Sequence, residues 1–139
     1  MTAQIIDGRK AARTLKAEVT AEVADLRAGG VPCGLATLMV GDDCSSRAYQ
    51  RRLDHTSDEL GVSYEQVNLP ETATQDEVLA VVHRLNEDPT VSGILVLRPL
   101  PRHISEVEVF RVLAPEKDIE SVHPESAGLL ALGTPRFVP

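Results

Sequence analysis

The sequence predicts an α/β fold with three α/β/α layers around a small, mainly parallel sheet. Segments with apolar residues at helical spacing alternate with short apolar runs. Capping residues stand before the helical segments, and glycine or proline follows the runs. Regular alternation of helix and strand is typical of a parallel sheet. The 139 residues are enough for a single core, so we expect one domain over 1–139.

The longest predicted helix covers 9–28. Apolar residues such as Leu15 and Val23 recur there at helical spacing, Asp7 is suited to the N-cap, and Gly29-Gly30 ends the segment. We expect this helix to pack on one face of the sheet.

The remaining elements follow from the same signals. Thr74 and Glu77 form a capping-box pattern before one helix, as do Ser105 and Glu108 before another. From Ala114 onward, proline and glycine predict mostly loop. The predicted strands are 34–40, 62–69 and 93–97, and the predicted helices run from "DDCSS" to Leu60, from Thr74 to Leu85 and from Ser105 to Leu113. We expect strand 93–97 to be buried and central.

The composition excludes several classes of function. A formal charge of −7 argues against nucleic acid, which requires a basic surface. No apolar run approaches the ~18 residues of a membrane span. Cys33 and Cys44 are too few for a disulfide framework and lack metal-ligand spacing, so we expect no metal and a reduced, cytoplasmic setting. Neither G-x-G-x-x-G nor a P-loop occurs, so no nucleotide site is predicted.

Three stretches are candidates for a site. The first is one face of a helix, whose residues at helical spacing are Tyr49, Leu53, Thr56 and Leu60. Core packing is the simpler interpretation for the two leucines, whereas Tyr49 could equally line a cleft.

The second stretch is "GILVLRPLP" (93–101), a predicted strand that ends in a stiff loop. Ligands of open α/β sheets bind at that end of the strands. Since side chains alternate, we expect Leu97 and Arg98 to face opposite ways, and the simplest alternative is a core leucine beside a solvated arginine. The third stretch is the loop 114–130, because long loops without structure of their own are often functional.

Six motifs stand in order along the chain: "IIDGRK" (5–10), "VGDDCSSRAYQ" (40–50), "LNEDPTVSGILV" (85–96), "PLP" (99–101), "APEKDI" (114–119) and "SAGLLALG" (126–133). In this order they resemble the bifunctional methylenetetrahydrofolate dehydrogenase/methenyltetrahydrofolate cyclohydrolase family, in its N-terminal folate-binding catalytic domain. The resemblance implies an amino-acid-dehydrogenase-like N-terminal fold and a substrate cleft lined by Tyr49, Leu53, Leu97, Arg98, Pro99, Leu100 and Glu120.

The same resemblance implies departures from the family. Tyr49 keeps the tyrosine whose ring stacks on the substrate. Leu53 stands where the family has its catalytic lysine, and Leu97 where it has a glutamine that hydrogen-bonds the lysine. Glu120 replaces an aspartate that holds the amino-pyrimidine edge of the pterin, and Ser121 replaces a glycine.

Leucine cannot donate, accept or carry a proton, so no catalytic group of the family is intact in this interpretation. Arg98 replaces a residue that is usually apolar, and it suits a new anionic ligand. Rescue by a neighbour is not expected, because Arg52 cannot deprotonate and His55 is two positions from Leu53 on the helix.

The sequence leaves two functions open. The first is a domain of folate one-carbon metabolism that resembles the NADP-dependent dehydrogenase/cyclohydrolase and is weak or inactive by itself. The alternative is a non-catalytic binder of a folate-like ligand, or a repurposed interaction module. In the family a C-terminal Rossmann domain binds NADP or NAD, and this chain stops at Pro139, so we expect that domain and its cofactor to be absent from this chain, while the natural protein is left open. A folate-like small molecule is the expected partner, and a homodimer is left open.

Overall fold

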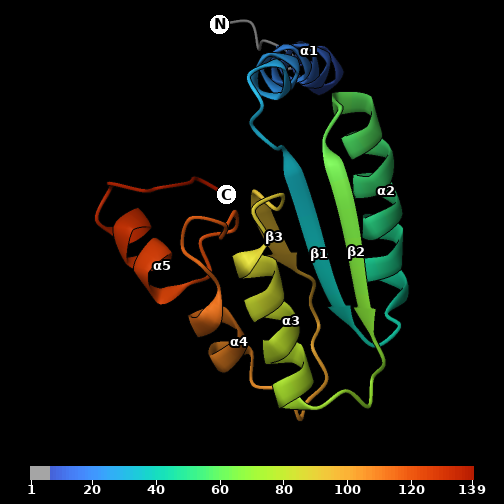
Figure 1. Ribbon diagram of the computed structural model, residues 1–139, viewed down its shortest axis with the longest axis vertical. Coiled ribbons are helices and arrows are strands. Elements are labelled where there is room, and N and C mark those ends of the chain that lie inside the picture. Colours follow the sequence, from blue (N-terminus) through green and yellow to red (C-terminus); the bar gives the residue numbers. More distant parts are fainter. Residues whose placement is uncertain (1–6) are drawn as a thin grey trace, which may run out of the picture.

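The computed structural model describes residues 7–139, so Ile5 and Ile6 of the first motif lie outside the described residues. Three parallel strands form one sheet in the order β2-β1-β3: β1 (Gly34–Val40), β2 (Ser63–Leu69) and β3 (Gly93–Val96). Helix α2 (Cys44–Leu60) covers one face, and α3 (Gln75–Glu87) and α4 (Glu106–Val112) cover the other (Figure 1). The predicted α/β fold with a small parallel sheet is confirmed.

Alternation along β1 explains these layers. Ala36, Leu38 and Val40 point into the larger core cluster, which α3 and α4 share. Leu35 and Met39 point to the opposite face, into the smaller cluster under α2. Because both faces are covered, the strand is apolar on both sides in the sequence, except at Thr37.

Strand β3 is buried as predicted, but the prediction that it is central is wrong, since β1 occupies the centre. The outer edge of β3 is covered by a loop. The amide of Ile94 donates to the carbonyl of Lys117 at 2.8 Å, and Ile94 forms an isolated parallel bridge with Asp118. Helices on both faces and a loop at the edge bury this strand as fully as a central one.

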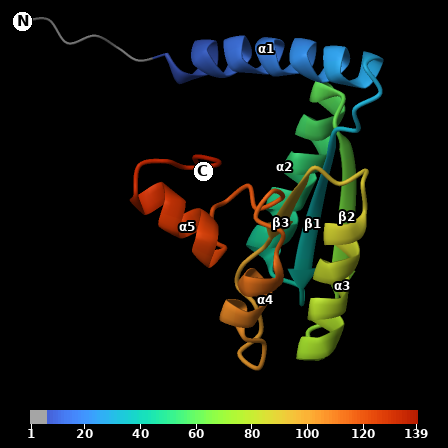
Figure 2. The ribbon, with the colours of Figure 1, turned by 60° about the vertical axis from the view of Figure 1, so that its left-hand side comes forward.

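The prediction that the first helix packs on a face of the sheet is also wrong. Helix α1 (Gly8–Ala28) lies across the N-terminal ends of the strands, where it contacts α2 (Figures 1 and 2). Its cap is as expected, since Asp7 accepts a hydrogen bond from the amide of Lys10 at 3.0 Å. Of its residues only Val23 is buried, and Leu15 is 61% exposed. Helical spacing identifies the apolar side of a helix but not what covers it.

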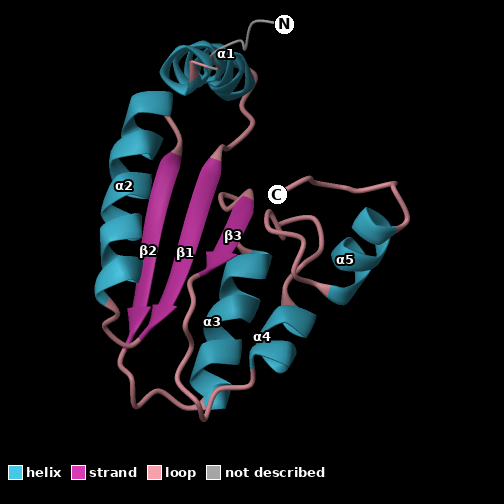
Figure 3. Ribbon diagram, turned by 180° about the vertical axis from the view of Figure 1, so that it is seen from behind, coloured by secondary structure: helices cyan, strands magenta, loops and turns pink. Residues whose placement is uncertain are grey.

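Helix α5 (Pro124–Ala131) was not predicted, because this region was expected to be mostly loop. It begins with a proline at its first position, and His123 Nδ1 accepts from the amide of Glu125 at 3.1 Å. Only Ser126 of this helix is buried. The segment therefore needs no apolar face, and it lacks the periodic apolar pattern from which a helix would have been predicted. Figure 3 shows α5 to one side of the sheet and its covering helices, in the part of the chain that leads to the C-terminus.

Candidate functional site

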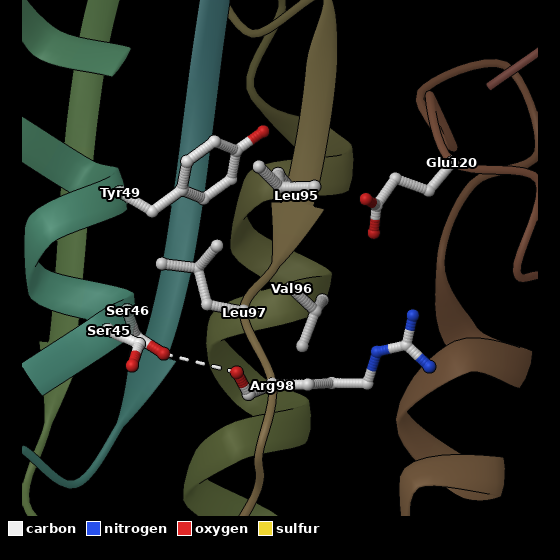
Figure 4. Close-up of a pocket in the computed structure, with 8 residues that line it drawn as sticks. All are labelled: Ser45, Ser46, Tyr49, Leu95, Val96, Leu97, Arg98 and Glu120. Carbon is white, nitrogen blue, oxygen red and sulfur yellow. Dashed lines mark hydrogen bonds between the residues drawn. The ribbon is translucent and has the colours of Figure 1, made fainter. Parts of the chain in front are cut away.

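A cleft lies beside the C-terminal end of β3, between α2 and the loop that follows α4 (Figure 4). Its volume is about 250 Å³. The lining residues are Ser45, Ser46, Tyr49, Leu95, Val96, Leu97, Arg98 and Glu120. Three segments that are far apart in the sequence therefore meet at this end of the sheet, where ligands of open α/β sheets bind.

The floor of the cleft is apolar. Leu95 and Leu97 face α2 and form the smaller cluster with Met39, and all three are buried. Leu53 of α2 and Ile119 of the loop pack against this cluster. Leu53 therefore supports the floor instead of lining the cleft.

A buried polar network fixes α2 against the sheet. Gln50, which is 3% exposed, donates through Nε2 to Thr37 Oγ1 at 3.1 Å and to Asn68 Oδ1 at 2.9 Å. Thr37 Oγ1 in turn lies 2.9 Å from the hydroxyl of Tyr64. The neighbouring residue, Tyr49, is thereby held over the cleft, where its side chain reaches toward Leu95 (Figure 4).

The sequence did not identify Gln50 as a positioning residue. The predicted stripe followed apolar residues, whereas the buried residues of α2 are Ser46, Gln50 and Ser57. Hydrogen bonds compensate the burial of such groups, so apolar spacing could not identify this face.

The first turn of α2 is tied to the end of β3. Asp43 caps the helix by accepting from the amide of Ser46 at 2.8 Å, and this hydrogen bond lowers the pKa of the Asp43 carboxyl. Ser46 Oγ lies 3.1 Å from the carbonyl oxygen of Arg98 and can donate to it (Figure 4). This contact holds the backbone of Arg98 beside α2.

On the opposite wall, the loop is anchored by Lys117. Its ammonium donates to three carbonyls at the end of α3, those of Leu85, Asn86 and Asp88, at 2.9, 2.7 and 2.7 Å. A cation at the C-terminal end of a helix also interacts favourably with the helix dipole. Residue 117 is thus fixed three positions before Glu120.

The turn around Glu120 has two further anchors. The fully buried carboxylate of Asp118 accepts from the amides of Val122 and His123 at 3.1 and 2.9 Å. Ser121 adopts a left-handed conformation with φ of 54°, and its hydroxyl donates to the carbonyl of Phe137 at 3.0 Å. Glu120 is therefore carried by a constrained turn.

Two charged groups border the cleft. Arg98 is exposed, and its guanidinium carbon lies 5.9 Å from the centroid of the Phe110 ring in α4. The Arg98 and Glu120 side chains lie on the side of the cleft away from Tyr49 (Figure 4). Within residues 7–139 neither of them forms an ion pair.

The structure separates other candidates from this cleft. Pro99 and Leu100 line a neighbouring depression, together with Gly41 and Asp42, so the single cleft expected from the sequence is divided in two. The side chain of His55 is 78% exposed and lies 3.5 Å from Glu59, away from the cleft.

The turn after β1 does not fit the pyrophosphate of a dinucleotide. The turn after β1 is Gly41-Asp42-Asp43, and the Asp43 carboxylate already occupies the N-terminus of α2, where a pyrophosphate would need free amides. Residues 7–139 also contain no group of three or more His, Cys, Asp or Glu side chains placed to hold a metal ion. No helix in this part of the chain has the length and apolar character to cross a membrane.

The sequence is similar to a family of known proteins. The family described as "Tetrahydrofolate dehydrogenase/cyclohydrolase, catalytic domain" matches residues 6–120. The chain is 58% identical to bifunctional protein FolD 3 of Rubrobacter xylanophilus, over all of the chain and 44% of that relative. It is 45% identical to FolD of Geobacillus thermodenitrificans, over all of the chain and 49% of that relative.

Solved structures agree with the sequence comparison. The bifunctional FolD enzyme of Campylobacter jejuni superposes with a TM-score of 0.92 at 34% identity, covering 96% of this chain and 48% of that one. The Trypanosoma brucei dehydrogenase-cyclohydrolase, complexed with NADP cofactor and inhibitor, gives 0.90 at 35% identity, covering 100% and 48%. The chain thus spans less than half the length of these relatives. It belongs to the tetrahydrofolate dehydrogenase/cyclohydrolase family, within the catalytic domain.

Proposed function

We propose that the cleft binds the pterin end of a reduced folate. The observation that carries this proposal is the placement of Tyr49 and Glu120 on different walls of one cavity with an apolar floor. Tyr49 offers a ring face for stacking, and the Glu120 carboxylate can accept two hydrogen bonds from an amino-pyrimidine edge. Clefts for drug-sized ligands begin at ~300 Å³, so a cavity of about 250 Å³ suits a single ring system.

The second part of the proposal is that this cleft moves protons poorly. Hydrolysis of a methenyl bridge adds water at the bridge carbon and releases a proton, and a positioned acid–base group typically contributes ~10²–10⁴-fold to such a step. Leu53 and Leu97, at the positions of the family's lysine and glutamine, can supply no such group. We therefore expect cyclohydrolase activity to be weak or absent.

The two leucines form a consistent pair. A buried glutamine without its lysine would leave a polar group unsatisfied, at about 1–3 kcal/mol. Replacing both partners by apolar side chains can be nearly neutral, and here both leucines belong to one apolar environment. The paired replacement removes the chemistry without disturbing the packing.

The dehydrogenase step, NADP binding and any homodimer belong, in this proposal, to a longer protein in which a nucleotide-binding domain is joined to this one. The incompatibility of the β1–α2 turn with a pyrophosphate supports this division. The relatives' greater length supports it as well. We further propose a cytoplasmic location.

A second candidate is a non-catalytic module for another flat ligand. The free guanidinium of Arg98 beside the cleft favours it, because such a charge is compatible with ligands other than folates.

Titration of the full chain with tetrahydrofolate tests the proposed function. We expect saturable binding that weakens by about tenfold or more in Tyr49→Ala and in Glu120→Gln, since each removes one principal contact. His55→Ala, an exposed change on α2 outside the cleft, is the matched control and should bind normally. Absence of saturable binding, or binding that neither cleft variant weakens, would contradict the proposal.

A further inference from the structure

Arg98 carries a positive charge that residues 7–139 do not pair. Its side chain lies over the Phe110 ring, and its carbonyl is within hydrogen-bond distance of Ser46 Oγ. Cation–π contact and a fixed backbone restrict where the guanidinium can lie. The group is therefore a positioned cation and not a freely moving surface charge.

The surroundings make this cation unusual. The protein has a formal charge of −7, yet among residues 7–139 Glu120 is the only acidic side chain that lines the cleft. No guanidinium nitrogen of Arg98 lies within 4.0 Å of a carboxylate oxygen of the described residues. An arginine stays protonated at all accessible pH values and binds carboxylates strongly, in a bidentate manner. The cleft thus presents an unused acceptor and an unused cation above an apolar floor.

We propose that Arg98 makes this cleft selective for flat heterocyclic ligands that carry a carboxylate close to the ring. The ring lies over Leu95 and Leu97, its donor edge faces Glu120, and its carboxylate pairs with Arg98. This inference rests on the proposed binding of a pterin ring and adds a negative charge on the ligand that strengthens the binding. Arg98 then determines specificity and takes no part in any proton transfer.

The size of the cavity supports a carboxylate attached directly to the ring. A volume of about 250 Å³ holds one ring system and a small substituent. Arg98 and Glu120 both line this one cavity, so a single compact ligand can reach both.

The test compares pterin-6-carboxylate with unsubstituted pterin, which lacks the carboxylate. Both are titrated with the full chain and followed by the ligand's own fluorescence. We expect pterin-6-carboxylate to bind at least about tenfold more tightly than pterin, because a charge-assisted hydrogen bond can contribute that much. The preference should shrink as salt is added, because Arg98 is exposed.

Three variants complete the test. Arg98→Met should abolish the preference for the carboxylate, and Arg98→Lys should restore part of it. Arg111→Met removes the same charge from an exposed position on α4 outside the cleft. This variant should keep the full preference for the carboxylate. A thermal unfolding curve for each variant verifies that it is folded.

The outcomes are distinguishable. Equal affinity for the two ligands in the parent chain, or a preference that survives in Arg98→Met, would overturn the role of Arg98 and leave the proposed function standing. Failure of both ligands to bind would overturn the proposed function itself.

Discussion

Leu53 of α2 packs against the same small apolar cluster that contains Leu97, the residue after β3. This shared environment links the two positions at which we propose that the chain departs from the catalytic pair of its family. It also means that a polar group returned to one position alone meets an apolar neighbourhood. The two substitutions are therefore expected to be coupled.

Restoring the pair should show this coupling. Leu53→Lys alone should destabilise the protein by about 1–3 kcal/mol, because a half-buried ammonium would lack a partner. Adding Leu97→Gln should recover part of that stability, and hydrolysis of methenyltetrahydrofolate should rise at least about tenfold over either single variant. Urea unfolding and loss of the methenyl absorbance measure the two effects.

Leu60→Lys is the matched control, since Leu60 is also half-buried on α2 but does not pack against the apolar cluster beneath the cleft. It should lose stability without gaining hydrolysis. Strictly additive effects of Leu53→Lys and Leu97→Gln would show that the two sites act independently.

The loop that carries Glu120 should depend on Lys117. Lys117→Met removes three hydrogen bonds from an ammonium to backbone carbonyls, and we expect it to cost about 2–3 kcal/mol and to weaken pterin binding. Lys16→Met removes an exposed ion pair with Glu59, and it should cost less than about 1 kcal/mol. Equal losses of stability in the two variants would contradict an anchoring role for Lys117.

Ser121 combines an unfavourable conformation with a favourable contact. Ser121→Ala keeps the side-chain Cβ at a positive φ and loses the hydrogen bond to Phe137, so it should destabilise by about 1 kcal/mol. Ser121→Gly loses the same bond but relieves about 1–2 kcal/mol of left-handed strain. Denaturant unfolding should therefore rank glycine above alanine, and the reverse order would refute the opposing contributions.

Acid should weaken the cap of α2. The amide of Ser46 lowers the pKa of Asp43 in the folded state, so ionised Asp43 stabilises the fold above its unfolded pKa of about 3.9, and this contribution is lost as pH falls through the lower folded pKa. Asp43→Asn keeps the capping oxygen without the charge. The parent should be the more stable at neutral pH, and the difference in urea midpoint should close below about pH 4. A constant difference would exclude this role for the charge.

Much of the fold was predictable because its signals are local. In the structure α2 begins after its N-cap Asp43 and ends at its C-cap Gly61. Helix α3 begins at the Thr74–Glu77 capping box. The placement of α1 and of β3 was wrong because neither spacing nor an apolar run specifies a neighbour. Such information resides in contacts between segments distant in the sequence.

Some residues of the site were likewise predictable from the sequence, and others were not. Tyr49, Leu97, Arg98 and Glu120 were recognised from motifs, and the structure brings them to one cleft. Gln50 and Lys117 were not recognised, since their partners are polar atoms of other elements. Pro99 was placed in the same cleft by the family resemblance, whereas in the structure it lines the neighbouring depression.

We propose that the cleft still binds a pterin ring and no longer supports proton transfer. The most direct measurement follows binding and hydrolysis of methenyltetrahydrofolate in one sample of the full, unmodified chain, beside FolD of Geobacillus thermodenitrificans. We predict saturable binding that Tyr49→Ala weakens, together with hydrolysis slower than that of the relative by ~10²-fold or more. Hydrolysis at a rate comparable to the relative's would rule out the loss of proton transfer, because another group would then have to move the proton.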